Sequence, residues 1–97
     1  MAIVEFTVIP IVKESLVNEI VDRAIKVVEE SGLNYEVGAN GTTIEGDLER
    51  VFEVVKKAHS VARDEGSGRV YTIIKIDDKL GGITIEEKVK KFRKEKK

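Results

Sequence analysis

Cysteine and tryptophan are absent from this chain of 97 residues, and proline, methionine and histidine each occur once. Without cysteine there can be no disulfide, no thiol catalysis and no zinc site built on cysteine. A single histidine leaves no second imidazole for a transition-metal site. The chain also lacks an apolar run of membrane-spanning length and a basic, then apolar leader, so we expect a soluble, cytoplasmic protein.

A strong excess of one charge is also missing, because the formal net charge is −1. No overall field therefore favours nucleic acid or an anionic membrane. Charged residues make up 36% of the chain, a high share that is typical of thermophiles, and hydrophobic residues make up 41%, which argues against disorder. The length predicts a single domain, residues 1–97, with one modest core. A ligand site would then lie on a sheet face, in a loop mouth or between subunits.

The hydrophobic pattern predicts four strands and three helices. Strand-like alternation or β-branched content marks residues 2–9, 35–39, 42–45 and 69–77. Helical periodicity runs from a cap at Ser15 to a stop at Gly32, and from a cap at Asp47 to a stop at 66–68. Asn40-Gly41 is a strong signal for a tight hairpin turn between the second and third strands. Thr84 and Glu87 form a capping box that predicts a short third helix.

This order of elements is β-α-β-β-α-β with an added C-terminal helix, which predicts an α+β, ferredoxin-like sandwich. Right-handed crossovers place both long helices on one face of an antiparallel sheet, with strand order 4-1-3-2. Residues 88–97 are rich in lysine and are predicted as a basic, partly frayed tail.

The other face of this sheet would carry a mixed cluster of side chains, while Thr42 and Ile44 would point to the helices. The predicted cluster contains Ile3, Glu5, Thr7, Glu36, Thr43, Glu45, Tyr71, Ile73 and Lys75. It allows three interpretations: a solvated face with cross-strand ion pairs, an interface between copies, or a polar pocket that a second subunit closes. In a pocket, the carboxylates would suit a cationic or amine-bearing ligand and Tyr71 would offer a flat ring.

Catalytic, metal and nucleic-acid sites are not predicted. His59 falls on the inner stripe of the second helix, where a single histidine usually packs and forms hydrogen bonds. Asp77-Asp78 is typical of a solvated turn, and no serine has the partners of a catalytic triad. The glycines fit neither a phosphate-binding loop nor a dinucleotide fingerprint. The predicted sheet face lacks the aromatic and basic residues of an RNA-binding module, so we expect no enzyme, cofactor, metal or nucleic acid.

Several motifs, in this order, resemble the small thiamine-binding protein family of archaea and bacteria. They are Val8-Ile9-Pro10, residues 32–37, residues 41–46, Lys57-Ala58-His59, residues 68–72, residues 75–79 and residues 82–89. The resemblance implies a ferredoxin-like chain that forms dimers or dimer-of-dimers tetramers. It also implies binding of thiamine or its hydroxymethylpyrimidine part without a known reaction. The run that carries over is Gly41, Thr42, Glu45 and Gly46.

With that ligand, the predicted binding residues are Glu5, Thr7, Asn40, Thr43, Glu45 and Tyr71. Glu5 or Glu45 would accept a hydrogen bond from the exocyclic amine or pair with the thiazolium cation. Tyr71 would stack on a ring, and the site would be shared between chains. The alternative is a structural or regulatory homo-oligomeric module that binds no small molecule. A third possibility is an enzyme with a cleft around His59.

Overall fold

The computed structural model describes residues 1–93, and residues 94–97 lie outside the described part of the chain. The strands are β1 (Ala2–Pro10), β2 (Asn34–Val37), β3 (Thr42–Gly46) and β4 (Val70–Asp78). The α-helices are α1 (Glu14–Glu30), α2 (Leu48–Ala62) and α3 (Ile85–Val89). A π-helical turn, η1 (Arg63–Ser67), follows α2, and a 3₁₀ turn, η2 (Lys90–Phe92), follows α3.

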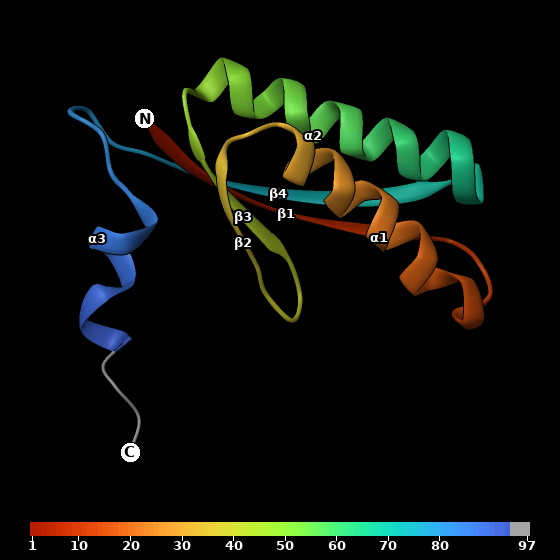
Figure 1. The fold of residues 1–97 in the computed structure, drawn as a ribbon. Helices are drawn as coiled ribbons and strands as arrows, with labels where there is room; N and C mark the ends of the chain where they lie inside the picture. The colour runs from red at the N-terminus through yellow and green to blue at the C-terminus, as the bar shows by residue number, and fades with distance from the viewer. Residues whose placement is uncertain (94–97) are drawn as a thin grey trace.

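The four strands form one antiparallel sheet with the order β2-β3-β1-β4, as the sequence predicts. Helices α1 and α2 pack against the same side of the sheet, and α3 lies on the opposite side (Figure 1). The predicted α+β, ferredoxin-like fold is therefore confirmed. We refer to the side of the sheet away from α1 and α2 as the open face.

The core lies between the sheet and the two long helices. Alternate β1 residues Val4, Phe6 and Val8 face it, and Thr42 and Ile44 face it from β3. The helices supply the other buried residues: Ile20, Ala24, Val27, Val28, Val51, Val54, Val55, Ala58 and Ala62. The period of two along the strands thus assigns the remaining β1 and β3 side chains to the open face.

The predicted helix ends are correct in part. Gly32 follows α1 with a φ of 77°, and Asp47 is the N-cap residue of α2. The predicted capping box of Thr84 and Glu87 is present at the start of α3. The prediction of Ser15 as a cap is wrong, because α1 begins one residue earlier, at Glu14, after Lys13. No side chain forms a capping hydrogen bond at the start of α1, so capping chemistry does not determine where this helix begins.

The hairpin between β2 and β3 exists, but its predicted turn is wrong. The strands are joined by a four-residue loop, Gly38 to Gly41, in which the Gly38 N–H donates to the Gly41 carbonyl at 2.8 Å. A two-residue Asn-Gly turn needs positive φ at both residues. Neither Asn40 nor Gly41 has a positive φ. The loop instead holds Asn40 by a hydrogen bond from the Thr7 hydroxyl to its carbonyl, at 2.7 Å.

The C-terminal segment, residues 85–93, covers one end of the open face. Ile85 is buried, and so is Ile3 on the open side of β1. Within the predicted tail 88–97, Lys88 and Val89 complete α3, and the next three residues form η2. The fraying predicted for this tail stays a prediction, and residues 94–97 lie outside the described part.

Candidate functional site

A row of four polar residues crosses the open face at one level of the sheet. In the strand register, Lys75 of β4 lies opposite Glu5 of β1, and Glu5 lies opposite Thr43 of β3. Thr43 in turn lies opposite Glu36 of β2. The Lys75 ammonium is 3.6 Å from a Glu5 carboxylate oxygen, with the lysine side chain well exposed. Two carboxylates therefore flank a hydroxyl, with a cation at the β4 end of the row.

This row forms the floor of a cavity of about 510 Å³ beside the β2–β3 hairpin, which we name the hairpin cavity. Its lining residues are Glu5, Thr7, Glu36, Val37, Gly38, Ala39, Asn40, Gly41, Thr43, Ile73, Lys75 and Arg93. Gly41 keeps one wall close to the floor. A Cβ at this position would lie 2.9 Å from the Thr7 hydroxyl oxygen and 3.2 Å from Glu5 Cγ. The absence of a side chain thus leaves room for Thr7 and Glu5.

A second cavity, of about 700 Å³, lies under the C-terminal segment. It is lined by Ile3, Glu5, Glu36, Thr43, Lys75, Ile76, Asp77, Asp78, Ile85, Lys88, Val89 and Arg93. Five of these residues also line the hairpin cavity: Glu5, Glu36, Thr43, Lys75 and Arg93. The polar row and Arg93 thus form the shared part of both cavities.

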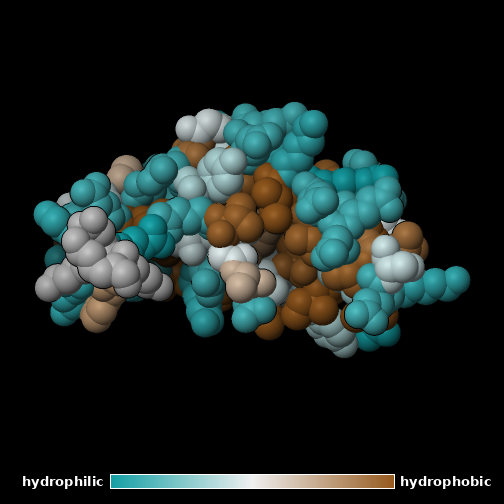
Figure 2. Space-filling view, turned by 60° about the horizontal axis from the view of Figure 1, so that its bottom comes forward, coloured by the Kyte–Doolittle hydropathy of each residue, from teal (hydrophilic) through white to brown (hydrophobic). Residues whose placement is uncertain are grey.

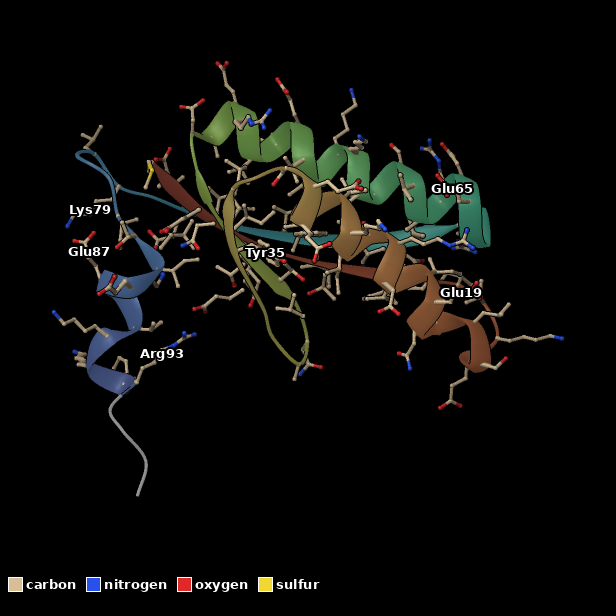
Figure 3. The ribbon with its side chains drawn as sticks, viewed as in Figure 1. Glu19, Tyr35, Glu65, Lys79, Glu87 and Arg93 are labelled. Atoms are coloured by element: carbon tan, nitrogen blue, oxygen red, sulfur yellow. The ribbon has the colours of Figure 1, made fainter. Side chains whose placement is uncertain are left out.

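Arg93 reaches back from the C-terminal segment to β2 and closes the row at its second end. Its two terminal nitrogens donate to the two carboxylate oxygens of Glu36, each at 2.5 Å. Figure 3 shows the Arg93 side chain extending from the end of η2 toward the rest of the molecule. The hydrogen bonds to Glu36, and then its negative charge, raise the pKa of Arg93 above its usual value. The row and Arg93 therefore carry two negative and two positive charges.

Glu45 lies on the predicted face but outside both cavities. One of its carboxylate oxygens accepts a hydrogen bond from the Ile85 backbone N–H at 2.7 Å, and the other accepts from the Asn34 side chain. The carboxylate thus holds the first turn of α3, where backbone N–H groups lack partners inside the helix. In this structure Glu45 attaches the C-terminal segment to the sheet.

Tyr71 also lies apart from the cavities. It is opposite Ile9 near the start of β4, and its side chain is exposed. The Arg69 guanidinium lies 5.6 Å from the centre of its ring and donates to its hydroxyl at 3.1 Å. Of the six predicted binding residues, the structure thus brings Glu5, Thr7, Asn40 and Thr43 together around the hairpin cavity. Glu45 and Tyr71 lie elsewhere.

Sequence reasoning placed Glu36 and Lys75 on the open face but missed Arg93 as part of the site. Arg93 falls in the stretch predicted as a frayed tail, and its partner Glu36 is 57 positions away. No local pattern encodes such a contact. The one available signal is the capping box at Thr84, which predicts that a helix follows but not where that helix lies.

His59 lies on the helix side of the sheet, away from the hairpin cavity. Its Nδ1 is 2.5 Å from the Thr72 hydroxyl oxygen, in a half-buried contact. It lines neither cavity of the open face. Within residues 1–93, no three carboxylate or histidine side chains are grouped so that they could hold a metal ion. No helix in that range is both long and apolar enough to span a membrane.

Comparison with known proteins assigns the chain to a family. A family model described as thiamine-binding protein matches residues 4–93. The chain belongs to the thiamine-binding protein family. That match includes all of β1 from Val4 onward, the hairpin, the polar row and Arg93.

Relatives of this thiamine-binding family member cover nearly its full length. It is 43% identical over 90 residues to a UPF0045 protein of Clostridium perfringens, covering 93% of this chain and 95% of that one. A solved structure from Thermotoga maritima, provisionally assigned to thiamine biosynthesis or salvage, is 39% identical with a TM-score of 0.89, covering 95% and 98% of the two chains. A Bacillus cereus domain of unknown function is 45% identical with a TM-score of 0.89, covering 96% and 90%.

Proposed function

We propose that this protein binds thiamine, or the hydroxymethylpyrimidine part of it, in the hairpin cavity without catalysing a reaction. The observation that carries the proposal is a cavity floored by two carboxylates in a chain whose match to the thiamine-binding family covers residues 4–93. The proposal places the protein in the cytoplasm, where it would act as a binding protein.

The size and lining of the hairpin cavity suit this ligand. Its volume of about 510 Å³ falls in the range of roughly 300–1,000 Å³ that is usual for small-molecule sites. Glu5 and Glu36 can accept from the exocyclic amine of the pyrimidine or face the thiazolium cation, because ionised carboxylates form the stronger, charge-assisted hydrogen bonds. Val37 and Ile73 supply apolar walls. We propose that Glu5, Thr7, Asn40 and Thr43 contact the ligand directly. Contacts of Glu45 and Tyr71 with the ligand stay predictions.

A second copy of the chain would complete the site along β4. This strand is nine residues long, is the last in the sheet order, and exposes Tyr71, Ile73, Ile74 and Ile76. Long apolar edge strands are templates for pairing with another chain. Hydrophobic residues also gather on the surface in Figure 2, over the middle and right of the view. Because Ile73 lines the hairpin cavity, a copy seated on β4 would add to its wall.

Calorimetry with protein freed of co-purified ligand tests the proposal. Thiamine should bind, and Glu5→Gln should raise its Kd about tenfold, because a charged hydrogen-bond acceptor at the floor is lost. Glu29→Gln, an exposed change on α1, is the matched control and should leave Kd unchanged. The absence of both heat and thermal shift at about 1 mM thiamine would reject the proposal.

The alternative function is a homo-oligomeric module without a small ligand. It is favoured by the contacts already made on the open face, where the chain's own Arg93 pairs with Glu36 and where Ile3 and Ile85 are both buried without a ligand. This alternative predicts stable oligomers together with no response to thiamine or hydroxymethylpyrimidine. The same calorimetry, combined with sedimentation, separates the two functions.

A further inference from the structure

The charges around the shared part of the two cavities are balanced before any ligand enters. Glu5 is paired with Lys75 at 3.6 Å, and Glu36 is paired through both its oxygens with Arg93. A ligand that carries only a positive charge can approach a carboxylate only by competing with the cation already there. It then leaves that lysine or arginine in solvent without its partner, which reduces the net gain from binding.

The two cations lie at the ends of the row and the two carboxylates lie inside it. Lys75 is on β4, Arg93 projects over β2, and Glu5 and Glu36 flank Thr43 between them. A complementary ligand would have its positive or hydrogen-donating part in the middle and a negative group at one end. An arginine fork is well suited to bind a phosphate by two parallel hydrogen bonds.

We infer that the cavity selects a phosphate ester of a thiamine-class cation over the free cation, and that Arg93 is the residue that determines this selection. The inference rests on the proposed function, because it specifies the ligand of the same site. The thiazolium or aminopyrimidine faces Glu5 and Glu36, and the phosphate takes over the Arg93 guanidinium when Glu36 turns to the ligand. Every charged group then keeps a partner of opposite sign.

The pair is exposed enough to exchange partners at modest cost. The side chains of Arg93 and Glu36 are 57% and 36% exposed. Ion pairs at such exposure contribute little to stability, so a ligand phosphate can replace the carboxylate. The same exposure limits the selectivity to a factor of about five in Kd, since solvent screens the interaction.

Calorimetric titration of the full chain with thiamine and with thiamine monophosphate tests the inference. The wild-type protein should bind the ester more tightly than free thiamine, by up to about fivefold. Arg93→Gln should remove this preference, because the protein would bind the ester more weakly and free thiamine more tightly. Arg93→Lys should retain part of the preference, because the positive charge remains although the two-pronged guanidinium is lost. Lys91→Gln, on the same turn but outside both cavities, should leave the ratio of the two Kd values unchanged.

The outcomes separate this inference from the proposed function. Equal or tighter binding of free thiamine to the wild type, or an unchanged ratio in Arg93→Gln, would overturn the inference and leave thiamine binding established. Binding of neither compound to any variant would overturn both. Inorganic phosphate serves as a further probe: it should compete with the ester in the wild type and lose that effect in Arg93→Gln.

Discussion

Single residues on the open face form two groups that differ in what they contact. Glu5 and Thr43 point into cavities, whereas Glu45 holds the backbone of Ile85 and the side chain of Asn34. The two carboxylates lie on the same face and have the same chemistry. Their roles therefore differ because of what lies above them: open space over Glu5, and the first turn of α3 over Glu45.

Replacing Glu45 by alanine should loosen the start of α3. The Ile85 N–H would lose its acceptor, at a cost of about 1–2 kcal/mol for a partly buried, charge-assisted hydrogen bond. Hydrogen exchange should show reduced protection of the Ile85 amide. Glu86→Ala, an exposed change one residue further along, should leave that amide protected as before. Unchanged protection in Glu45→Ala would show that this contact does not hold the helix.

Sequence alternation predicts the face of such residues but not their partners. The period of two placed Glu5, Thr7, Thr43 and Glu45 correctly on the open face, because Val4, Phe6 and Ile44 had to be buried. Alternation could not show that Glu45 accepts a hydrogen bond from Ile85, since that contact depends on the path of the loop between β4 and α3. The Asn40-Gly41 turn failed for a related reason: the bond from Thr7 to Asn40 favours a wider loop than the dipeptide alone predicts.

Among the elements, the C-terminal segment is attached to the sheet mainly by polar contacts. These are the hydrogen bond from the Ile85 N–H at the start of α3 to Glu45, the ion pair of Lys88 with Asp77, and the pair of Arg93 with Glu36. Ile85 is its buried apolar anchor. Gly81 and Gly82, both with φ of 88°, form the bend before it. Such a segment should open at lower free energy than the core strands do.

High salt should therefore loosen this segment before it affects the rest of the fold. At about 1 M NaCl the Debye length falls to about 3 Å, which screens exposed ion pairs. Hydrogen exchange of residues 85–93 should quicken, while the α2 amides serve as an internal control. Lys88→Gln should reproduce part of the effect at low salt, and Lys90→Gln should not. Equal protection at both salt concentrations would mean that the exposed ion pairs do not hold the segment.

At the scale of the whole molecule, the two sheet edges differ in length and character. The β2 edge is four residues long and is bordered by the hairpin loop, whereas β4 presents nine residues with apolar side chains on both faces. On its helix side, Ile74 and Ile76 remain partly exposed. The longer edge is the better surface for a second copy.

A charge on the β4 edge should prevent assembly. Ile74→Lys places an ammonium on an exposed apolar strand and should raise the dissociation constant of the assembly at least about tenfold, because a buried interface excludes an unpaired charge. Sedimentation velocity measures this directly. Leu80→Lys, in the fully exposed loop after β4, is the control and should assemble normally. A wild-type chain that sediments as a monomer would contradict the expected interface.

The overall fold was largely predictable, because it depends on local patterns repeated along the chain. Strand alternation, helical stripes and the order of elements sufficed to give the sheet order β2-β3-β1-β4. The candidate site was predictable only as far as it lies on the strands. Arg93 and the C-terminal segment escaped prediction, since a five-residue helix carries a starting signal at Thr84 but no information about the surface on which it packs.

The residue at the position of Gly41 can be compared among members of the family. Any side chain at this position would come within 2.9 Å of the Thr7 hydroxyl and crowd Glu5, so the chain can have either a Cβ here or the present arrangement of the two. A relative with alanine or a larger residue at the equivalent position would need the residues that correspond to Thr7 and Glu5 to shift on the same fold. One aligned position therefore serves as a marker of which homologues can keep this arrangement of Thr7 and Glu5 at the floor of the hairpin cavity.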